Sequence, residues 1–290
     1  MWGAFSAVFR YTKAYRNPIS IIYKVINNRF PFLAYTRVSD QQVEIINHIM
    51  AYNLSWFEYL KYNYSVEHNR VELPNLKNRL NAPLEFYGAI YDGDLQGVFG
   101  QELYREINCK NLIVLDVGAN IGDSSIYFAL KGASRVVALE PFPATYELAK
   151  KNVEVNGFSD KIFVINGGLG KKNEKISIPN DISSTGGLKA ENYNHGIQVE
   201  MFTLESIMQK FNFGSNTVLK IDCEGCEYDV FNYTEDKTLR QFGQIIMEYH
   251  DGIKDLGKRL SGIGFQVESN SNTFNYCFRR IHQILFTRQR

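Results

Sequence analysis

The sequence has no apolar run close to the length of about 20 residues that a membrane-spanning helix requires. Its first residues also lack a continuous apolar core followed by a small-residue cleavage site, so no secretory signal is indicated. Cysteine is scarce, with four residues at positions 109, 223, 226 and 277. So few cysteines in a chain of 290 residues do not form a disulfide framework, which favours a reducing compartment. We therefore expect a cytoplasmic protein.

The chain also lacks an excess of charge of either sign. Its 32 Lys and Arg residues nearly balance its 31 Asp and Glu residues, which gives a net charge of +1. A nucleic-acid-binding protein normally has a strongly basic surface, so we expect no nucleic-acid partner.

Acidic residues are missing from residues 1–39, although this segment contains six Lys and Arg residues. Trp2, Phe5, Phe9 and Thr12 fall on one face of a predicted helix. Such a helix is typical of peripheral contact with an anionic membrane surface. The alternative is that its aromatic residues pack on the main domain or on a second subunit, as in a homo-oligomer.

The first third of the chain predicts a helical N-terminal domain over residues 1–84. Its clearest element is a helix over 39–64, in which apolar residues repeat at helical spacing. After it, we expect a short hairpin over 86–99 and a helix over 101–107. The second domain would span residues 85–290.

From residue 111 onward, strand and helix patterns alternate, which indicates an α/β fold with a doubly wound, mostly parallel sheet. The predicted strands lie at 112–117, 135–140, 161–166, 217–222 and 244–248, with a last hairpin formed by 265–268 and 282–287. The predicted helices lie at 123–131, 144–156, 203–211 and 256–261. Between them, residues 167–198 form a long loop with two short strand-like pieces, and such loops are usually functional or mobile.

A glycine turn follows the first of these strands. It has the spacing Asp116-x-Gly118-x-Asn120-x-Gly122, which does not fit the Gly-x-Gly-x-x-Gly of dinucleotide-binding folds. It resembles the Asp/Glu-x-Gly-x-Gly-x-Gly signature of S-adenosylmethionine-dependent methyltransferases, with Asn120 in place of the middle glycine. A strand, a glycine turn and a helix N-terminus together are typical of a nucleotide site. The alternative is a tight turn that binds no ligand.

Two further positions lie at the ends of the next strands, where a doubly wound sheet binds its ligands. Glu140 ends the second strand and is predicted to accept hydrogen bonds from ribose hydroxyls, with Phe142 beside it in the turn. Alternatively, Glu140 caps the next helix. Asn166 ends the third strand and is a candidate for the adenine edge, although Asn-Gly is also a common turn pair.

The fourth strand ends in an acidic segment, Asp222-Cys223-Glu224-Gly225-Cys226-Glu227, and the fifth ends in Glu248-Tyr249-His250. Asp222, Glu224 and His250 are candidates for a catalytic base. Asp222, Glu224 and Glu248 are alternatively candidate Mg²⁺ ligands. A purely structural role, as a salt bridge or a helix cap, is a further alternative for each acid.

Cys223 and Cys226 allow a second interpretation of the acidic segment, as a redox dithiol. The acidic neighbours disfavour it, because they raise the pKa of a thiolate. Half of a zinc site is also disfavoured, since Cys109 and Cys277 do not supply a matching second pair.

Together these motifs resemble the FkbM family of S-adenosylmethionine-dependent O-methyltransferases. The matching segments are 114–123, 138–143, 219–227 and 248–250, and the similarity extends over roughly residues 85–290. The resemblance implies a seven-stranded, Rossmann-like class I methyltransferase sheet with one antiparallel strand. It also implies methylation of a hydroxyl on a sugar, glycolipid or natural product. The cofactor would be held by Asp116, Gly118, Asn120, Gly122 and Glu140.

Two other functions remain as alternatives. One is an NAD-type oxidoreductase, and the other is a non-catalytic cofactor-binding module at a membrane or in an assembly. The basic first 39 residues motivate the second of these.

Overall fold

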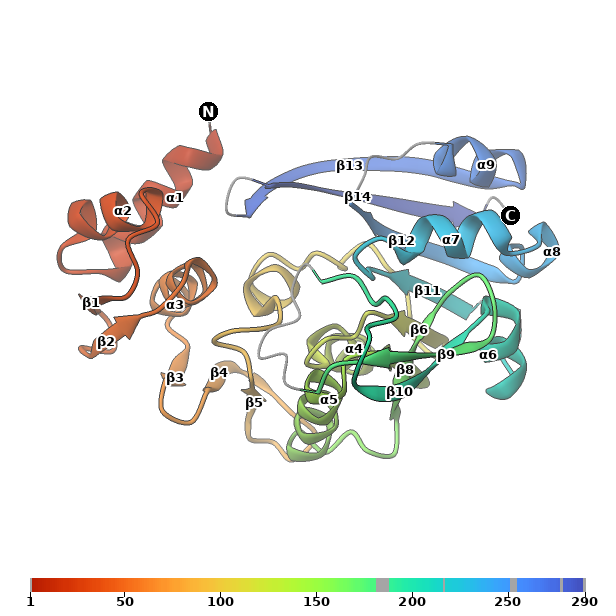
Figure 1. Ribbon diagram of the computed structural model, residues 1–290, viewed down its shortest axis with the longest axis horizontal. Coiled ribbons are helices and arrows are strands. Elements are labelled where there is room, and N and C mark those ends of the chain that lie inside the picture. Colours follow the sequence, from red (N-terminus) through yellow and green to blue (C-terminus); the bar gives the residue numbers. More distant parts are fainter. Residues whose placement is uncertain (1, 181–187, 216, 251–254, 277–278, 289–290) are drawn as a thin grey trace. The chain divides into compact units, whose positions relative to one another are not determined.

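The computed structural model describes residues 2–180, 188–215, 217–250, 255–276 and 279–288 (Figure 1). The chain groups into two compact units. The first contains residues 1–103 and 274–280, and the second contains 104–273 and 281–290. This division falls later in the chain than the expected boundary at residue 84. In the parts of the chain that are described, no helix combines the length and the apolar character needed to cross a membrane.

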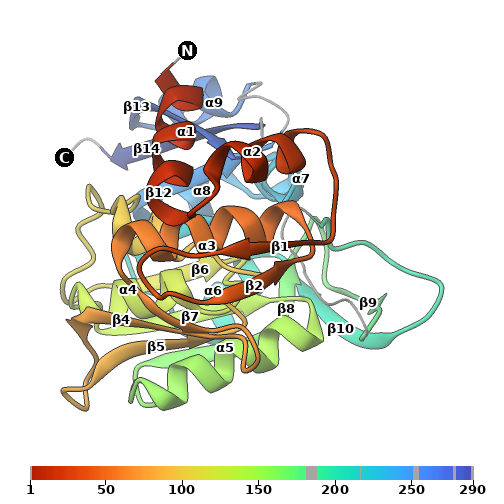
Figure 2. The same cartoon turned by 90° about the vertical axis from the view of Figure 1, so that its left-hand side faces the viewer.

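The first unit is mixed α/β, so the expectation of a helical domain is wrong. Its helices are α1 (Trp2–Ala14), α2 (Pro18–Ile26) and α3 (His48–Leu60), followed by a short π-helix (Gln96–Gly100) (Figure 2). Its strands form two small antiparallel sheets, one of β1 (Phe32–Tyr35) with β2 (Gln42–Ile45) and one of β3 (Asn63–Ser65), β4 (Arg70–Lys77) and β5 (Pro83–Tyr87).

Three predicted elements of this unit are wrong. The helix expected over 39–64 begins only at His48, because Val43 and Ile45 are buried at the alternating spacing of strand β2 and Asn47 caps α3 with its side chain. Residues 86–99 form no hairpin, since β5 pairs back to β4 instead. Residues 101–107 form turns rather than a helix.

Helix α1 buries a different face from the one the sequence suggested. Phe9 is exposed, whereas Tyr11, Ala14 and Tyr15 are buried. Arg10 is buried as well; its Nε donates to Ser55 Oγ at 2.8 Å and its guanidinium lies 4.5 Å from the ring of Trp56. The side chains of Trp2 and Phe5 lie outside the described residues.

The second unit contains the expected doubly wound α/β sheet. Its strand order is β13-β14-β12-β11-β6-β7-β8-β10-β9. The strands are β6 (Ile113–Val117), β7 (Arg135–Glu140), β8 (Ile162–Leu169), β9 (Glu174–Ile178), β10 (Ile197–Phe202), β11 (Thr217–Ile221), β12 (Phe242–Tyr249), β13 (Phe265–Tyr276) and β14 (Arg279–Arg288). The stretch from β13 to β8 confirms the predicted seven-stranded, mostly parallel sheet. The two pieces of the long loop, β10 and β9, extend the sheet to nine strands.

Pairing within this sheet is parallel from β12 through β11, β6, β7 and β8 to β10. Strand β14 runs antiparallel to β12, and β9 runs antiparallel to β10. The carboxyl ends of β6, β7, β11 and β12 therefore meet at one edge of the sheet. This is the edge where such sheets bind ligands.

Helices cover both faces of the sheet (Figure 1). One face packs on α4 (Asp123–Leu130) and α5 (Pro143–Val155). The other packs on α6 (Leu204–Lys210), α7 (Cys226–Tyr233), α8 (Asp236–Leu239) and α9 (Leu256–Gly262). The central strands are buried on both sides, which explains their continuous apolar character in the sequence.

Candidate active site

The glycine turn after β6 lies against the segment that follows β11. Gly118 has φ +72°, and a Cβ atom placed on it would lie 1.7 Å from the carbonyl oxygen of Asp222. The amide of Asp222 also donates to Val117 O at 3.1 Å. Only glycine permits such a close approach of two backbones, so the turn and the acidic segment form one continuous structure.

The rest of the turn is held by local hydrogen bonds. Asn120 adopts a left-handed conformation with φ 48°, which Asn tolerates better than most residues. Its Oδ1 accepts the amide of Ile121 at 2.7 Å. Gly122, with φ +85°, begins helix α4, and a Cβ atom there would lie 3.4 Å from Ala149.

Glu140 joins the end of β7 to this turn. It is buried, and its Oε2 accepts the amide of Asn120 at 2.8 Å while its Oε1 accepts the amide of Phe142 at 2.9 Å. Asn166 supports the same corner from β8, since its Nδ2 donates to the carbonyl oxygens of Glu140 and Pro141 at 3.0 Å each. Asn166 therefore stabilises the turn after β7 rather than facing the cavity described below.

Asp116 lies beneath the turn and is fully buried. Its carboxylate accepts hydrogen bonds from Ser124 Oγ at 2.7 Å and Ser125 Oγ at 2.5 Å, and it lies 3.1 Å from Lys220 Nζ. Lys220 also donates to Gly118 O at 2.8 Å. Burial lowers the pKa of Lys220, but the charges of Asp116 and Asp222 outweigh this effect and raise it. Lys220 is therefore a buried cation that connects β6, the glycine turn and the acidic segment.

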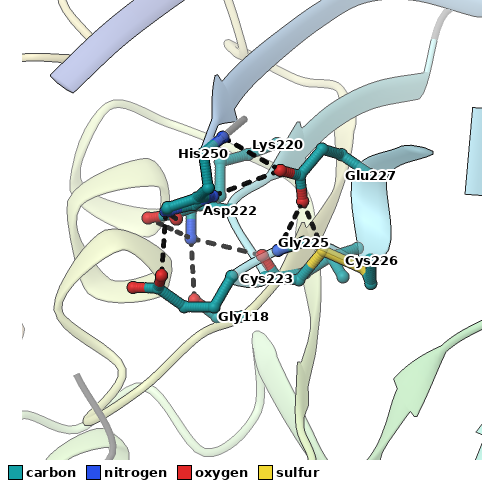
Figure 3. Close-up of a disulfide and its surroundings, with 10 residues drawn as sticks. Gly118, Lys220, Asp222, Cys223, Gly225, Cys226, Glu227 and His250 are labelled. Atoms are coloured by element: carbon teal, nitrogen blue, oxygen red, sulfur yellow. Dashed lines mark hydrogen bonds and ion pairs between the residues drawn. A yellow bond between two sulfur atoms is a disulfide. The ribbon is translucent and has the colours of Figure 1, made fainter. Parts of the chain in front are cut away.

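His250 lies among four carboxylates at the ends of β11 and β12. Figure 3 shows His250 with two of them, Asp222 and Glu227. Its Nε2 lies 3.1 Å from Glu224 and 3.8 Å from both Asp222 and Glu248. Its Nδ1 lies 3.2 Å from Glu227 Oε1, which also accepts the backbone amide of His250. The structure thus brings together the three predicted catalytic residues, Asp222, Glu224 and His250.

These carboxylates control the protonation of the imidazole. Burial lowers the pKa of His250, but the hydrogen bond with Glu227 and the charges of Asp222, Glu224 and Glu248 raise it to about 9. Burial in turn raises the pKa of Glu227, and the contacts with His250 outweigh it and lower that pKa. At neutral pH, the pair is therefore an imidazolium beside a carboxylate.

Cys223 and Cys226 form a disulfide across the acidic segment (Figure 3). The two residues between them, Glu224 and Gly225, both have positive φ. The sequence disfavours a redox dithiol at these two cysteines, yet the structure joins them in the disulfide that such a dithiol forms on oxidation. One disulfide is still not the disulfide framework that the cysteine count excludes. The disulfide closes the turn that carries Glu224. Cys109 is a free, buried thiol, and Cys277 lies outside the described residues.

A cavity with about 590 Å³ of empty space, part of it open to solvent, lies over this edge of the sheet. Its lining includes Gly118, Asn120, Glu140 and Phe142 from the region of the glycine turn, together with Asp222 and Glu224 of the acidic segment. Its apolar wall includes Leu169, Leu188 and Met201. Asp116, Gly122, Asn166 and His250 do not line it.

The predicted Mg²⁺ ligands were Asp222, Glu224 and Glu248. Among the described residues, the set whose ligand atoms lie within 4.8 Å of one another is Asp222, Glu224 and His250. Mg²⁺ takes oxygen ligands and only reluctantly exchanges them for nitrogen. The set does not fit the predicted ion, and no role of a metal is derived from it.

A model of the FkbM methyltransferase domain matches residues 116–285. The chain belongs to this methyltransferase family. The match includes the glycine turn, Glu140, the acidic segment and His250, and thus both the residues that line the cavity and those that support it.

Curated relatives match shorter parts of the chain. Methyltransferase 1 of Beauveria bassiana is 26% identical over 180 residues, which cover 53% of this chain and 72% of that protein. Protein arginine N-methyltransferase 1 of Saccharomyces cerevisiae is 45% identical over 70 residues, or 24% of this chain. The uncharacterized protein MJ1452 of Methanocaldococcus jannaschii is 33% identical over 100 residues, or 34% of this chain. The chain spans 19% of the yeast protein and 38% of the archaeal one.

Among solved structures, this chain is similar to methyltransferase FkbM from Methylobacillus flagellatus. The TM-score is 0.46 and the sequence identity is 15%, over 69% of this chain and 50% of that one. TrmK of M. capricolum, solved with S-adenosyl-homocysteine, has a TM-score of 0.44 and 13% identity over 66% of this chain and 67% of that one.

Two residues of this FkbM-family chain that the structure places centrally, Lys220 and Glu227, have no role in the sequence analysis. Lys220 had a signal, because it is a lone cation in the apolar strand β11 and pairs in register with Asp116, the lone acid of β6. No feature of the sequence distinguishes Glu227 from the two other acids between positions 222 and 227. Its contact with His250 arises because helix α7 begins at Cys226 and places Glu227 beside the imidazole.

Proposed function

We propose that this methyltransferase transfers a methyl group from S-adenosylmethionine to a hydroxyl of a sugar, glycolipid or natural-product acceptor. The observation that carries the proposal is the shared cavity. Gly118, Asn120 and Glu140 of the glycine-turn region and Asp222 and Glu224 of the acidic segment line the same space. A cofactor held on one side and an acceptor hydroxyl on the other would meet there, and such proximity contributes about 7–11 kcal/mol to catalysis.

The residues fit S-adenosylmethionine by their chemistry. The close packing of Gly118 on the backbone of Asp222 fixes the turn, and Gly118 itself lines the cavity. Glu140 lines the cavity with a carboxylate, a group that accepts hydrogen bonds from ribose hydroxyls. Phe142 adds an aromatic wall. When bound, S-adenosylmethionine supplies the methyl group.

Asp116, Gly122 and Asn166 would act on the cofactor indirectly. Asp116 is buried under the turn, Gly122 starts α4, and Asn166 holds the carbonyl oxygens after β7. We therefore assign them as positioning residues, and Gly118, Asn120, Glu140 and Phe142 as the residues that contact the cofactor.

The acceptor hydroxyl must lose its proton during the transfer, and a positioned base contributes about 10²–10⁴-fold. Asp222 and Glu224 line the cavity as carboxylates. His250 is protonated at neutral pH because its pKa is raised to about 9. This favours Asp222 as the base, with His250 holding the carboxylates in place.

The runner-up function is an NAD-type oxidoreductase, which the glycine spacing disfavours. Short matches to arginine N-methyltransferases make a guanidinium a further acceptor to test. A non-catalytic cofactor-binding module is the remaining alternative.

Calorimetry with S-adenosylmethionine and with NAD distinguishes a methyltransferase from an oxidoreductase. We expect S-adenosylmethionine to bind and NAD not to bind. Transfer of labelled methyl groups to pooled glycans, glycolipids and arginine-rich protein then identifies the acceptor class. Label that is stable to base and recovered on a sugar hydroxyl supports the proposal. Binding of NAD alone, or label on arginine, would contradict it.

A further inference from the structure

Helix α2 of the first unit presents an apolar face that nothing in the described chain covers. Ile19, Tyr23 and Ile26 are 83%, 51% and 62% exposed. They stand at spacings of four and three residues, so they form one stripe on the helix. Ile21 alone is buried, which fixes the opposite face of α2 on its own unit. Three large exposed apolar residues on one short helix are typical of an interaction site.

Cations border this stripe. The Arg29 guanidinium lies 5.0 Å from the ring of Tyr23, and Lys24 Nζ lies 5.1 Å from the ring of Phe32. Nearby on α1, Lys13 Nζ lies 5.3 Å from the ring of the exposed Phe9. Cations that sit over aromatic rings combine a positive rim with apolar contact.

The charge of this segment is one-sided. Residues 1–39 contain six Lys and Arg residues, of which Arg10 is buried, and no Asp or Glu, although the whole chain has a net charge of only +1. The next acids are Asp40, which pairs with Arg16, and Glu44, which is exposed on β2 opposite Leu33. The positive charge is thus a local property of this surface.

We infer that the stripe Ile19–Tyr23–Ile26, with its rim of Lys24 and Arg29, docks on an anionic phospholipid surface. The apolar side chains enter the boundary between headgroups and acyl chains, and the cations contact the anionic headgroups. A second copy of the chain fits less well, because a two-fold contact through this face would bring the cationic rims of both copies together. The inference does not depend on which acceptor is methylated.

Vesicle flotation of the full chain tests this inference. Vesicles of phosphatidylcholine and phosphatidylglycerol in equal amounts are expected to carry the protein, while phosphatidylcholine alone carries much less. High salt should weaken the binding, since surface charges are then screened. The triple variant Ile19→Ser/Tyr23→Ser/Ile26→Ser should lose about tenfold or more in partitioning, and Lys24→Glu/Arg29→Glu a similar amount.

Matched controls use exposed residues outside the stripe. Leu80→Ser removes an apolar side chain that is 67% exposed, and Lys77→Glu/Lys258→Glu makes the same change in net charge. Both controls should float like the wild type. The inference is overturned if the wild type stays unbound on anionic vesicles. It is also overturned if chromatography shows a dimer that the triple variant dissociates while vesicle binding is unchanged.

Discussion

At the scale of single residues, the site depends on buried groups of opposite charge. A charge removed from water is costly unless a partner compensates for it. Glu227 is this partner for His250, since its carboxylate contacts both Nδ1 and the backbone amide of the histidine. This contact orients Nε2 of His250 toward Asp222 and Glu224. The carboxylates that line the cavity, Asp222 and Glu224, are thus held in place by His250 and Glu227, which do not line it.

Asp222→Asn should keep cofactor binding and lose turnover by about 10²–10⁴-fold, because the amide cannot take a proton from the acceptor. Calorimetry with S-adenosylmethionine and single-turnover methyl transfer measure the two effects. Asp160→Asn, at an exposed position, is the control. Unchanged turnover in Asp222→Asn would remove Asp222 from its proposed role.

The raised pKa of His250 predicts a dependence of stability on pH. The folded state binds the proton more tightly than the unfolded state, so this contribution is fully present below pH about 6.5 and is lost as the pH rises toward 9. We expect the free energy of unfolding to fall by roughly 2–3 kcal/mol over this range.

Urea unfolding at a series of pH values measures this loss, and His250→Gln should flatten the curve. Glu227→Gln should lower the pKa of His250, as read from its imidazole resonance by NMR. A His250 that titrates near pH 6.5 in the wild type would contradict the assignment.

At the scale of elements, the site is the junction of two strand ends. The turn after β6 and the segment after β11 touch at Gly118 and Asp222, and Lys220 joins them from below. The two strands are neighbours in the sheet and pair in register. The glycine turn and the acidic segment are therefore held together as one structure.

Gly118→Ala should abolish cofactor binding and destabilise the fold. The new Cβ atom would lie 1.7 Å from Asp222 O, and φ +72° is unfavourable for alanine. Gly214→Ala is the matched control, since nothing lies within 4 Å of its added Cβ atom. Thermal unfolding and calorimetry distinguish the two variants, and equal behaviour would contradict the close packing at Gly118.

Lys220→Met should cost about 3–5 kcal/mol in the free energy of unfolding, because it leaves Asp116 buried without its cation. Adding Asp116→Asn should restore part of that loss. The coupling free energy from urea unfolding of both single variants and the double variant measures the pair. If the changes in unfolding free energy of the two single variants simply add up in the double variant, the 3.1 Å contact between Lys220 and Asp116 does not contribute to stability.

At the scale of the whole molecule, the chain combines a methyltransferase unit with a mixed α/β N-terminal unit. The cavity is built by residues of the second unit alone, from Val117 to Cys226. The apolar stripe on α2 belongs to the first unit. Chemistry and surface attachment are thus assigned to separate parts of the chain.

S-adenosyl-homocysteine at about 100 times its dissociation constant should stabilise the protein by about 2.7 kcal/mol, because it binds the folded state only. A thermal shift should record this gain, and the same concentration of NAD should give none. The stripe variant Ile19→Ser/Tyr23→Ser/Ile26→Ser should respond like the wild type. A shift with NAD and none with S-adenosyl-homocysteine would support the oxidoreductase alternative.

Local pattern was enough to predict the second unit. Buried parallel strands are continuous apolar runs, so the sequence predicts β6, β7, β11 and β12, whereas their order in the sheet comes from the structure. The first unit was predicted poorly. A short strand such as Gln42–Ile45 has too few residues to distinguish its period from that of the helix after it. Strands β4 and β5 contain Pro74 and Pro83, and proline disfavours the prediction of a strand.

The sequence by itself determined which residues are available for chemistry, because Gly118, Glu140, Asp222 and His250 each follow a recognisable strand. Only the tertiary structure decided which of them share a cavity and which support it from beneath. Asp116 and Asn166 point to other protein groups, while Lys220 and Glu227 supply buried charges whose partners lie on different strands. The physical reason is that burial and charge compensation depend on neighbours in space, and these neighbours are far apart in the chain.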